Sequence, residues 1–177
     1  MFRLYFISIN DYNHIYYIQK MEHIIMSDAH SYIKWINKKL KLNNHFNKNK
    51  ERLNNWKVNR GQIYTCFLGE NIGYEKSKIE ARPCVIVSTK RINHESGNVI
   101  IVPFSKNIKY ERGTTNLKYP YHYVLKKTDY PKLDYDSVVQ CEDIRCVSKA
   151  RLSTYICNVK HEDMRGIKKR LKEALQL

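Results

Sequence analysis

Cysteine and histidine are the side chains with which a small protein most often binds a metal or does redox chemistry, and their spacing here argues against both. The five cysteines, at positions 66, 84, 141, 146 and 157, contain no C-x-x-C pair, and most lie in or beside apolar runs. An odd number of scattered cysteines favours reduced thiols in a cytosolic protein over a disulfide framework or a zinc site. The seven histidines show no metal-ligand spacing either. We expect no structural metal and no cofactor.

Lysine and arginine dominate the charge of the chain. The 32 lysines and arginines outnumber the 17 aspartates and glutamates, which gives a formal net charge of +15. Such an excess attracts polyanions over long distances, and each phosphate that a cation neutralises releases bound counterions. Nucleic acid is therefore the first partner that the composition suggests. An acidic protein partner, or a basic surface that serves only solubility, is the alternative.

No segment of the sequence is suited to a membrane or to export. No run approaches the roughly 20 apolar residues of a transmembrane helix. Polar residues interrupt the N-terminal apolar run too early for a secretion signal. We expect a cytoplasmic protein without membrane contact.

Residues 1–57 form an N-terminal extension that we expect to be partly helical and basic. Ser27 and Asp28 are plausible N-caps of a helix. The apolar residues that recur after them at helical spacing, among several lysines, are Ile33, Ile36 and Leu40. This pattern predicts a short amphipathic surface helix packed on the main domain, followed by a polar stretch over residues 43–55. An arm that contacts a binding partner is the alternative.

From residue 58 the sequence changes to short runs of β-forming residues, each bounded by glycine, proline, asparagine or charged clusters. The runs span residues 62–68, 83–88, 99–104, 122–125, 137–141 and 151–159. No helical segment separates them, so we predict a mainly β domain over residues 58–177 whose antiparallel strands close into a small barrel. A helix ends the domain, because Met164, Ile167 and Leu171 share one helical face with acidic residues before them and basic residues around them.

Five motifs follow one another in this domain: RGQIY at 60–64, LGENIGYE at 68–75, ARPCVIVST at 81–89, NVIIVPFS at 98–105 and DSVVQCEDIRCVSKARL at 136–152. Together with the closing EDMRGIKKRLKEALQL they resemble the MazF/PemK toxins over residues 58–177. The resemblance implies an SH3-like antiparallel barrel of the CcdB/PemK/MazF type with a C-terminal helix, usually assembled as a homodimer. It also implies a toxin of a type II toxin–antitoxin system: a sequence-specific, ribosome-independent endoribonuclease that cuts single-stranded RNA or mRNA without a metal. A cognate acidic antitoxin would neutralise it.

The resemblance places Arg82, of the Arg-Pro motif, and Ser105, at the end of the NVIIVPFS run, in the catalytic positions. The expected chemistry is attack of a 2′-hydroxyl on the adjacent phosphate, which leaves a 2′,3′-cyclic phosphate and a 5′-hydroxyl. Arginine offers a rigid fork of donors matched to phosphate, and Pro83 fixes the backbone beside it. We therefore assign Arg82 the scissile phosphate and Ser105, where most relatives carry threonine, a hydrogen bond to it. The structural alternatives are a salt bridge of Arg82 with Glu75 or Glu80 and a strand-end turn at Ser105.

Two further residues, Glu142 and His122, could transfer protons or orient the site. Glu142 could orient Arg82 or a base edge, or instead pair with Arg145, and His122 could be purely structural. Gln140 stands where some relatives have a second catalytic arginine. The residues that we expect to contact RNA, including one tyrosine that could stack on a base, are Arg60, Tyr74, Glu75, Lys76, Lys78, Lys106, Lys109 and Gln140.

Two other functions suit the same fold. The CcdB toxins inhibit gyrase through a tryptophan-containing C-terminal tail, whereas this chain ends Ala174-Leu175-Gln176-Leu177. A non-catalytic module that binds nucleic acid or an antitoxin is the other alternative. In either of these functions, or in the nuclease, the helix of the extension could be an arm that contacts RNA or antitoxin.

Overall fold

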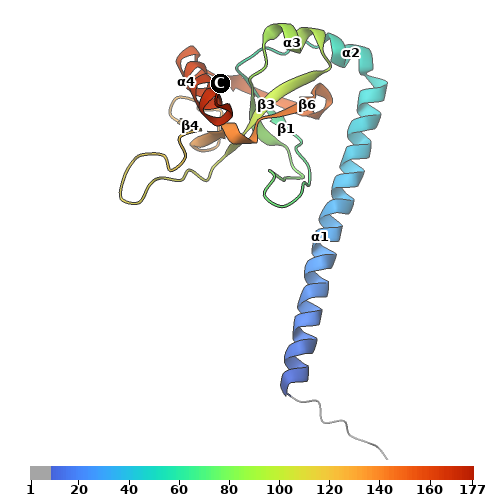
Figure 1. Cartoon of the computed structure of the whole chain (residues 1–177). Coiled ribbons are helices and arrows are strands. Elements are labelled where there is room, and N and C mark those ends of the chain that lie inside the picture. Colours follow the sequence, from blue (N-terminus) through green and yellow to red (C-terminus); the bar gives the residue numbers. More distant parts are fainter. Residues whose placement is uncertain (1–8) are drawn as a thin grey trace, which may run out of the picture.

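The structure is a computed structural model that describes the backbone of residues 9–177 and the side chains of residues 29–177. A long N-terminal helix projects from a small β-domain that also carries a C-terminal helix (Figure 1). The helices are α1 (Ile9–Lys48), α2 (Lys50–Asn55), α3 (Lys90–Glu95) and α4 (His161–Leu175), with the 3₁₀ turns η1 (Cys141–Asp143) and η2 (Lys149–Arg151). The strands are β1 (Gln62–Cys66), β2 (Arg82–Ile86), β3 (Asn98–Ser105), β4 (His122–Leu125), β5 (Ser137–Gln140), β6 (Arg145–Ser148) and β7 (Leu152–Asn158).

The strands form one antiparallel sheet that curls into a barrel. Six of them follow the order β4-β5-β3-β2-β1-β7, and β6 pairs with β3. Only η2 separates β6, which pairs with β3, from β7, which pairs with β1, so β3, β2, β1, β7 and β6 close into a ring. The buried side chains that fill this barrel interior are Val58, Tyr64, Cys66, Leu68, Cys84, Ile86, Val99, Ile101, Val147 and Leu152.

All six predicted β-runs are strands, with ends shifted by a few residues. Within the β-domain the prediction lacked β6 and α3. Both are short, and each contains only one buried residue, Val147 in β6 and Asn93 in α3, so neither shows the apolar alternation or periodicity by which elements are recognised in a sequence. Thr89 caps α3, since its side chain accepts a hydrogen bond from the Ile92 amide.

A second apolar cluster lies between the outer face of the sheet and α4. Ile63, Val102, Phe104 and Val139 contribute from three strands, β1, β3 and β5, and Ile167 of α4 is fully buried against them. At the start of α4, Asp163 accepts hydrogen bonds from the hydroxyls of Tyr123, at 2.6 Å, and Tyr130. One turn later Gly166 lies so close to the Tyr123 ring that an added Cβ would come within 2.2 Å of it.

We expect Asp163→Ala to lower the free energy of unfolding by about 2–4 kcal/mol, because two largely buried tyrosine hydroxyls lose their acceptor. Burial is the larger cause, and the hydrogen bond to Asp163 the next, of a rise in the pKa of Tyr123 to about 12. The same two causes raise the pKa of Tyr130. The network therefore contributes its full stability below pH about 10, and this contribution is lost as the pH rises through about 12. Urea unfolding across this range measures both effects. Equal alkaline destabilisation of the wild type and of the Tyr123→Phe/Tyr130→Phe double variant would contradict the assignment.

The extension differs from the prediction in both its bounds and its packing. α1 begins at Ile9, so Ser27 and Asp28 lie within the helix and do not cap it. The stretch over residues 43–55, predicted only as polar, is helical except at Asn49, which separates α1 from α2.

The face of α1 that packs on the barrel is the one that carries Trp35, and the predicted apolar stripe Ile33, Ile36 and Leu40 is exposed. Trp35 is only 7% exposed, and its indole covers the backbone at Gly69. Ser31 donates a hydrogen bond to Glu70 at 2.9 Å. The surface helix packed on the main domain is therefore present, but one aromatic anchor holds it.

The shorter helix α2 is held by Leu53 and by a buried lysine. The Lys149 side chain is fully buried and donates to the backbone carbonyl of Asn54 at 3.3 Å. Its burial lowers the pKa of the ammonium group. The boundary between an extension of residues 1–57 and a toxin domain of residues 58–177 stays a prediction about domain organisation.

None of the helices in the described part of the chain is both long and apolar enough to cross a membrane.

Candidate functional site

The pairing of β2 with β3 brings the strand ends that carry Arg82 and Ser105 to the same edge of the barrel. The two strands pair Ile86 with Ile101 and Cys84 with Pro103. Arg82 begins β2 and Ser105 ends β3, so each lies two residues beyond the last of these pairs. Residues two apart in a strand point to the same face of the sheet, so both side chains belong to the face of Cys84 and Pro103. The arginine and the hydroxyl that the sequence singled out therefore lie on one face, at neighbouring strand ends.

Arg82 is half-buried and keeps most of its donors unused. One guanidinium nitrogen donates weakly to the Ser77 carbonyl at 3.4 Å. Partial burial lowers the pKa of Arg82, Asp143 opposes this shift and Arg145 adds to it. Among residues 29–177 no carboxylate lies within ion-pair distance of the guanidinium. The alternative of a surface salt bridge with Glu75 or Glu80 is therefore not what the structure shows.

Ser105 takes part in a strand-end turn and still has a hydroxyl proton to donate. Its oxygen accepts a hydrogen bond from the Asn107 amide at 3.2 Å. This is the turn predicted as the structural alternative, and it uses only a lone pair of the hydroxyl. Ser105 also pairs with Val138 of β5, which extends the same face of the sheet towards β4.

His122 and Glu142 form a bonded pair on the next row of this face. His122 of β4 stands opposite Gln140 of β5, and its Nε2 lies 2.7 Å from a carboxylate oxygen of Glu142. The imidazole is buried, and its Nδ1, like the side-chain carbonyl oxygen of Gln140, has no partner among the described residues. Glu142 therefore contacts His122, and neither the predicted pair with Arg145 nor a direct contact with Arg82 is present.

The β1–β2 loop is tied to the site by an ion pair that the sequence analysis missed. Lys76 of this loop lies 3.6 Å from Asp143 in η1. Burial raises the pKa of Asp143, and the charge of Lys76 opposes that shift. A shallow cavity of about 440 Å³ opens here, lined by Glu75, Glu142, Asp143, Ile144 and Arg145. Asp143 and Arg145 sit in the DSVVQCEDIRCVSKARL motif, but only the fold brings them near Arg82.

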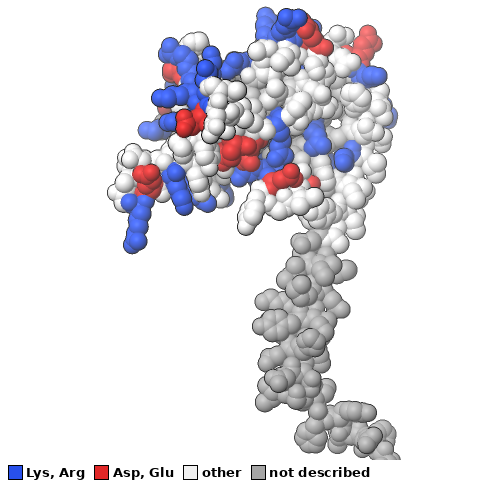
Figure 2. Space-filling model, in the orientation of Figure 1, with Lys and Arg blue, Asp and Glu red and all other residues white. Residues whose placement is uncertain are grey.

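The other predicted RNA contacts are divided between several places. Tyr74 and Lys78 are exposed on the β1–β2 loop, and Lys106 and Lys109 on the loop after β3. Arg60 does not join them, because it lines a separate cavity with the α4 residues Arg165 and Lys168 among others. Basic side chains are spread widely over the described surface, with a group of acidic ones among them on the barrel face seen in Figure 2.

Comparison with known proteins assigns the family. The family model described as the PemK-like, MazF-like toxin of type II toxin–antitoxin systems matches residues 59–175. The chain belongs to this family. It is 33% identical over 110 residues to the endoribonuclease MazF of Staphylococcus saprophyticus, a match that covers 60% of this chain and 84% of that protein. The resemblance seen in the sequence and the prediction of an enzyme of this toxin family are confirmed.

Solved structures of MazF-type toxins share the fold. A mycobacterial endoribonuclease in complex with its cognate antitoxin is 25% identical with a TM-score of 0.53, covering 68% of this chain and 96% of that one. MazF from Deinococcus radiodurans is 16% identical with a TM-score of 0.56, covering 69% and 99%. The predicted fold of the toxin, an antiparallel barrel of this type with a C-terminal helix, is confirmed. The roles of its individual site residues stay predictions.

Proposed function

We propose that this toxin is a sequence-specific, ribosome-independent endoribonuclease that cuts single-stranded RNA, including mRNA, in the cytoplasm, and that it does so without a metal. The observation that carries the proposal is that Arg82 and Ser105 lie at neighbouring ends of the paired strands β2 and β3, in a chain with a formal net charge of +15. Cleavage of mRNA would inhibit translation and growth.

The reaction needs charge stabilisation more than covalent chemistry from the protein. The 2′-oxygen of one nucleotide forms a bond to phosphorus while the bond from phosphorus to the 5′-oxygen of the next nucleotide breaks. One proton leaves the 2′-hydroxyl and another is added to the departing 5′-oxygen. The products are a 2′,3′-cyclic phosphate and a 5′-hydroxyl. Charge builds up on the phosphoryl oxygens, and preorganised donors aimed at them lower the barrier.

Arg82 supplies the largest share of this stabilisation. Its fork binds two phosphoryl oxygens at once, and its partial burial strengthens the interaction. With an ordinary pKa above 12, an arginine is a poor proton acceptor, so we assign it the charge and not the proton. The Ser105 hydroxyl donates a further hydrogen bond to the same phosphate.

Glu142 is the group that we propose for proton transfer, with His122 as its positioning residue. The Glu142 side chain is 37% exposed and can meet a substrate, whereas that of His122 is 3% exposed. The Nε2 of the buried His122 imidazole lies 2.7 Å from a carboxylate oxygen of Glu142. This contact fixes the direction of the Glu142 side chain.

The toxin would act as a homodimer and be neutralised by a cognate acidic antitoxin. The strong positive charge of the chain suits an acidic partner. The mycobacterial relative of known structure was solved with its cognate antitoxin, which supports the same arrangement here.

The decisive experiment is incubation of the purified chain with a long natural single-stranded RNA in excess chelator. We expect discrete fragments with 5′-hydroxyl and 2′,3′-cyclic phosphate ends, at sites that sequencing of the ends will define. Intact RNA together with inhibited DNA supercoiling would favour a gyrase inhibitor. Intact RNA that is bound tightly would favour a non-catalytic module.

Ser105→Ala will lower the single-turnover cleavage rate about 10²-fold, because one hydrogen bond to the charged transition state is lost. Ser105→Thr keeps the hydroxyl and will retain most of the rate. Ser96→Ala is the matched control, since the Ser96 hydroxyl also accepts the amide of the residue two positions later, at 3.0 Å, away from the site. If Ser96→Ala and Ser105→Ala slow cleavage equally, Ser105 is only a turn residue.

A further inference from the structure

A cavity lies away from Arg82, between the extension and β7. Its volume is about 630 Å³, within the range of pockets that hold small ligands. The residues that line it are His45, Arg52, Leu53, Asn55, Trp56, Lys57, Ala150, Leu152 and Ser153. The first six precede the family match, which begins at residue 59, and the last three belong to it. The N-terminal extension therefore completes a pocket that the family domain alone would leave open.

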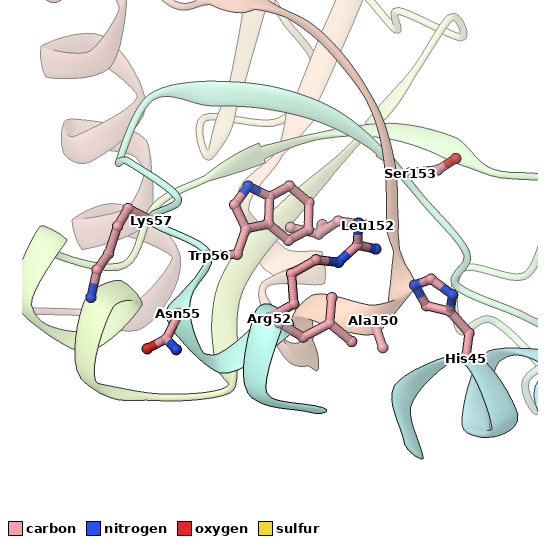
Figure 3. Close-up of a pocket in the computed structure, with 9 residues that line it drawn as sticks. His45, Arg52, Asn55, Trp56, Lys57, Ala150, Leu152 and Ser153 are labelled. Carbon is pink, nitrogen blue, oxygen red and sulfur yellow. The ribbon is translucent and has the colours of Figure 1, made fainter. Parts of the chain in front are cut away.

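Trp56 provides a flat aromatic wall with a fixed orientation. Its ring meets the ring of Tyr64 edge to face, with centroids 5.5 Å apart, and it packs against the barrel-interior cluster. Because Tyr64 is itself buried, the indole has a rigid support. The side chains of Trp56, Arg52 and Leu152 converge in the pocket, and His45 approaches from the α1 side (Figure 3).

The lining is cationic as well as aromatic. Arg52, Lys57 and His45 contribute basic groups, and no carboxylate lines the pocket. Arg52 has no hydrogen-bond or ion-pair partner among the described residues, so its guanidinium donors are available. A flat aromatic wall beside unpaired arginine donors is the combination by which proteins bind single-stranded nucleic acid without reading its sequence.

We propose that this pocket binds one nucleotide of a single-stranded RNA, its base against the Trp56 ring and its phosphate at Arg52 and His45. The proposal rests on RNA being the substrate of the toxin, and it adds a contact that lies outside the cleavage site. An acidic peptide would satisfy the cations but leave Trp56 and the apolar floor of Leu53 and Leu152 without a matching group. A nucleobase covers all three.

The first experiment measures binding without cleavage. A fluorescently labelled, fully 2′-O-methylated RNA oligonucleotide of mixed sequence has no 2′-hydroxyl to attack, so anisotropy reports affinity alone. We expect Trp56→Ala to raise Kd about tenfold, as loss of one stacked base does, and Trp56→Phe to retain most of the affinity. Arg52→Ala will raise Kd and make the slope of log Kd against log salt shallower by about 0.7, the value for one phosphate of a single strand.

Arg91→Ala is the matched control for Arg52→Ala. It removes the same charge from another exposed short helix, where Arg91 pairs only with Glu95. We expect it to change Kd less than twofold. Equal effects of Arg52→Ala and Arg91→Ala, or wild-type affinity in both Trp56→Ala and Arg52→Ala, would overturn the proposal.

Tryptophan fluorescence tests the base contact directly. The chain has two tryptophans, and Trp35 is buried against Gly69. In the Trp35→Phe variant all tryptophan emission comes from Trp56, and the oligonucleotide will quench it if a base stacks there. Quenching by a polyglutamate peptide, with none by the oligonucleotide, would overturn the proposal in favour of a peptide site.

The experiments distinguish an error in the pocket proposal from an error in the nuclease proposal. If the pocket is wrong, RNA is still cut and the pocket variants bind as the wild type does. If the nuclease assignment is wrong, unmodified RNA stays intact, while Trp56→Ala and Arg52→Ala still weaken binding of the methylated oligonucleotide.

Discussion

Arg82→Ala will lower the single-turnover rate of RNA cleavage about 10³-fold, the upper range for loss of one preorganised group that stabilises a transition-state charge. The guanidinium is half-buried, begins the strand next to the one that Ser105 ends, and has no carboxylate partner among residues 29–177. Its charge is therefore available to the phosphate that we propose it binds. Because binding of the rest of the RNA does not depend on this side chain, Kd for an uncleavable RNA will rise far less than the rate falls.

Arg82→Lys tests whether Arg82 acts through its positive charge alone or through two parallel hydrogen bonds to the phosphate. Lysine keeps the positive charge but cannot donate two parallel hydrogen bonds to one phosphate, so we expect it to recover less than a tenth of the wild-type rate. Arg91→Ala controls for the loss of net charge. Cleavage by Arg82→Ala at a rate within tenfold of the wild type would exclude the central role of Arg82.

The strands of the barrel were predictable because their signal is local. Arg82 and Ser105 were placed at strand ends from the apolar runs beside them, and both occupy those ends. That these two strand ends lie next to each other depends on the pairing of β2 with β3, which is set by packing between distant parts of the chain. Only the resemblance to known toxins assigned Arg82 and Ser105 to the same catalytic site, because the residues by themselves did not connect them.

The local chemistry around Arg82 could not be predicted, because it depends on contacts distant in the sequence. The ion pair of Lys76 with Asp143 joins a loop to a 3₁₀ turn that follows β5. The contact of His122 with Glu142 requires β4 and β5 to pair. The sequence left open whether Glu142 orients Arg82 or a base edge or pairs with Arg145, and it gave no reason to connect Glu142 with His122, which lies 20 residues earlier.

The extension shows how one large side chain can outweigh a periodic pattern. The stripe Ile33, Ile36 and Leu40 predicted the packed face of α1, yet Trp35 occupies that face. A buried tryptophan removes up to about 250 Å² from water, and Lys38 adds a contact by placing its ammonium group 3.8 Å from the centre of the Phe67 ring. Gly69 leaves room for the indole. Nothing in the sequence around Gly69 predicts that α1, which is distant in sequence, packs on it.

Gly69→Ala will lower the free energy of unfolding by about 3–5 kcal/mol if the Trp35 indole is forced out of its site, the cost of losing a buried tryptophan. An added Cβ would lie 2.1 Å from two atoms of the indole, and Gly69 also has a φ of +87°. Gly73→Ala is the matched control: it lies in the same loop with a φ of +58°, but nothing lies within 4 Å of its added Cβ. We expect this control to cost about 1 kcal/mol, the backbone strain alone.

The position of Trp35 can be followed separately from global stability. In a Trp56→Phe background the only tryptophan emission comes from Trp35, and Gly69→Ala will make it accessible to acrylamide while Gly73→Ala will not. Equal destabilisation by the two substitutions, with Trp35 shielded in both, would mean that backbone strain and not the indole sets the cost. Because α1 meets the barrel through Trp35 and leads on to α2 and Trp56, loss of the Trp35 contact will also weaken binding of the methylated oligonucleotide in the pocket that the extension completes.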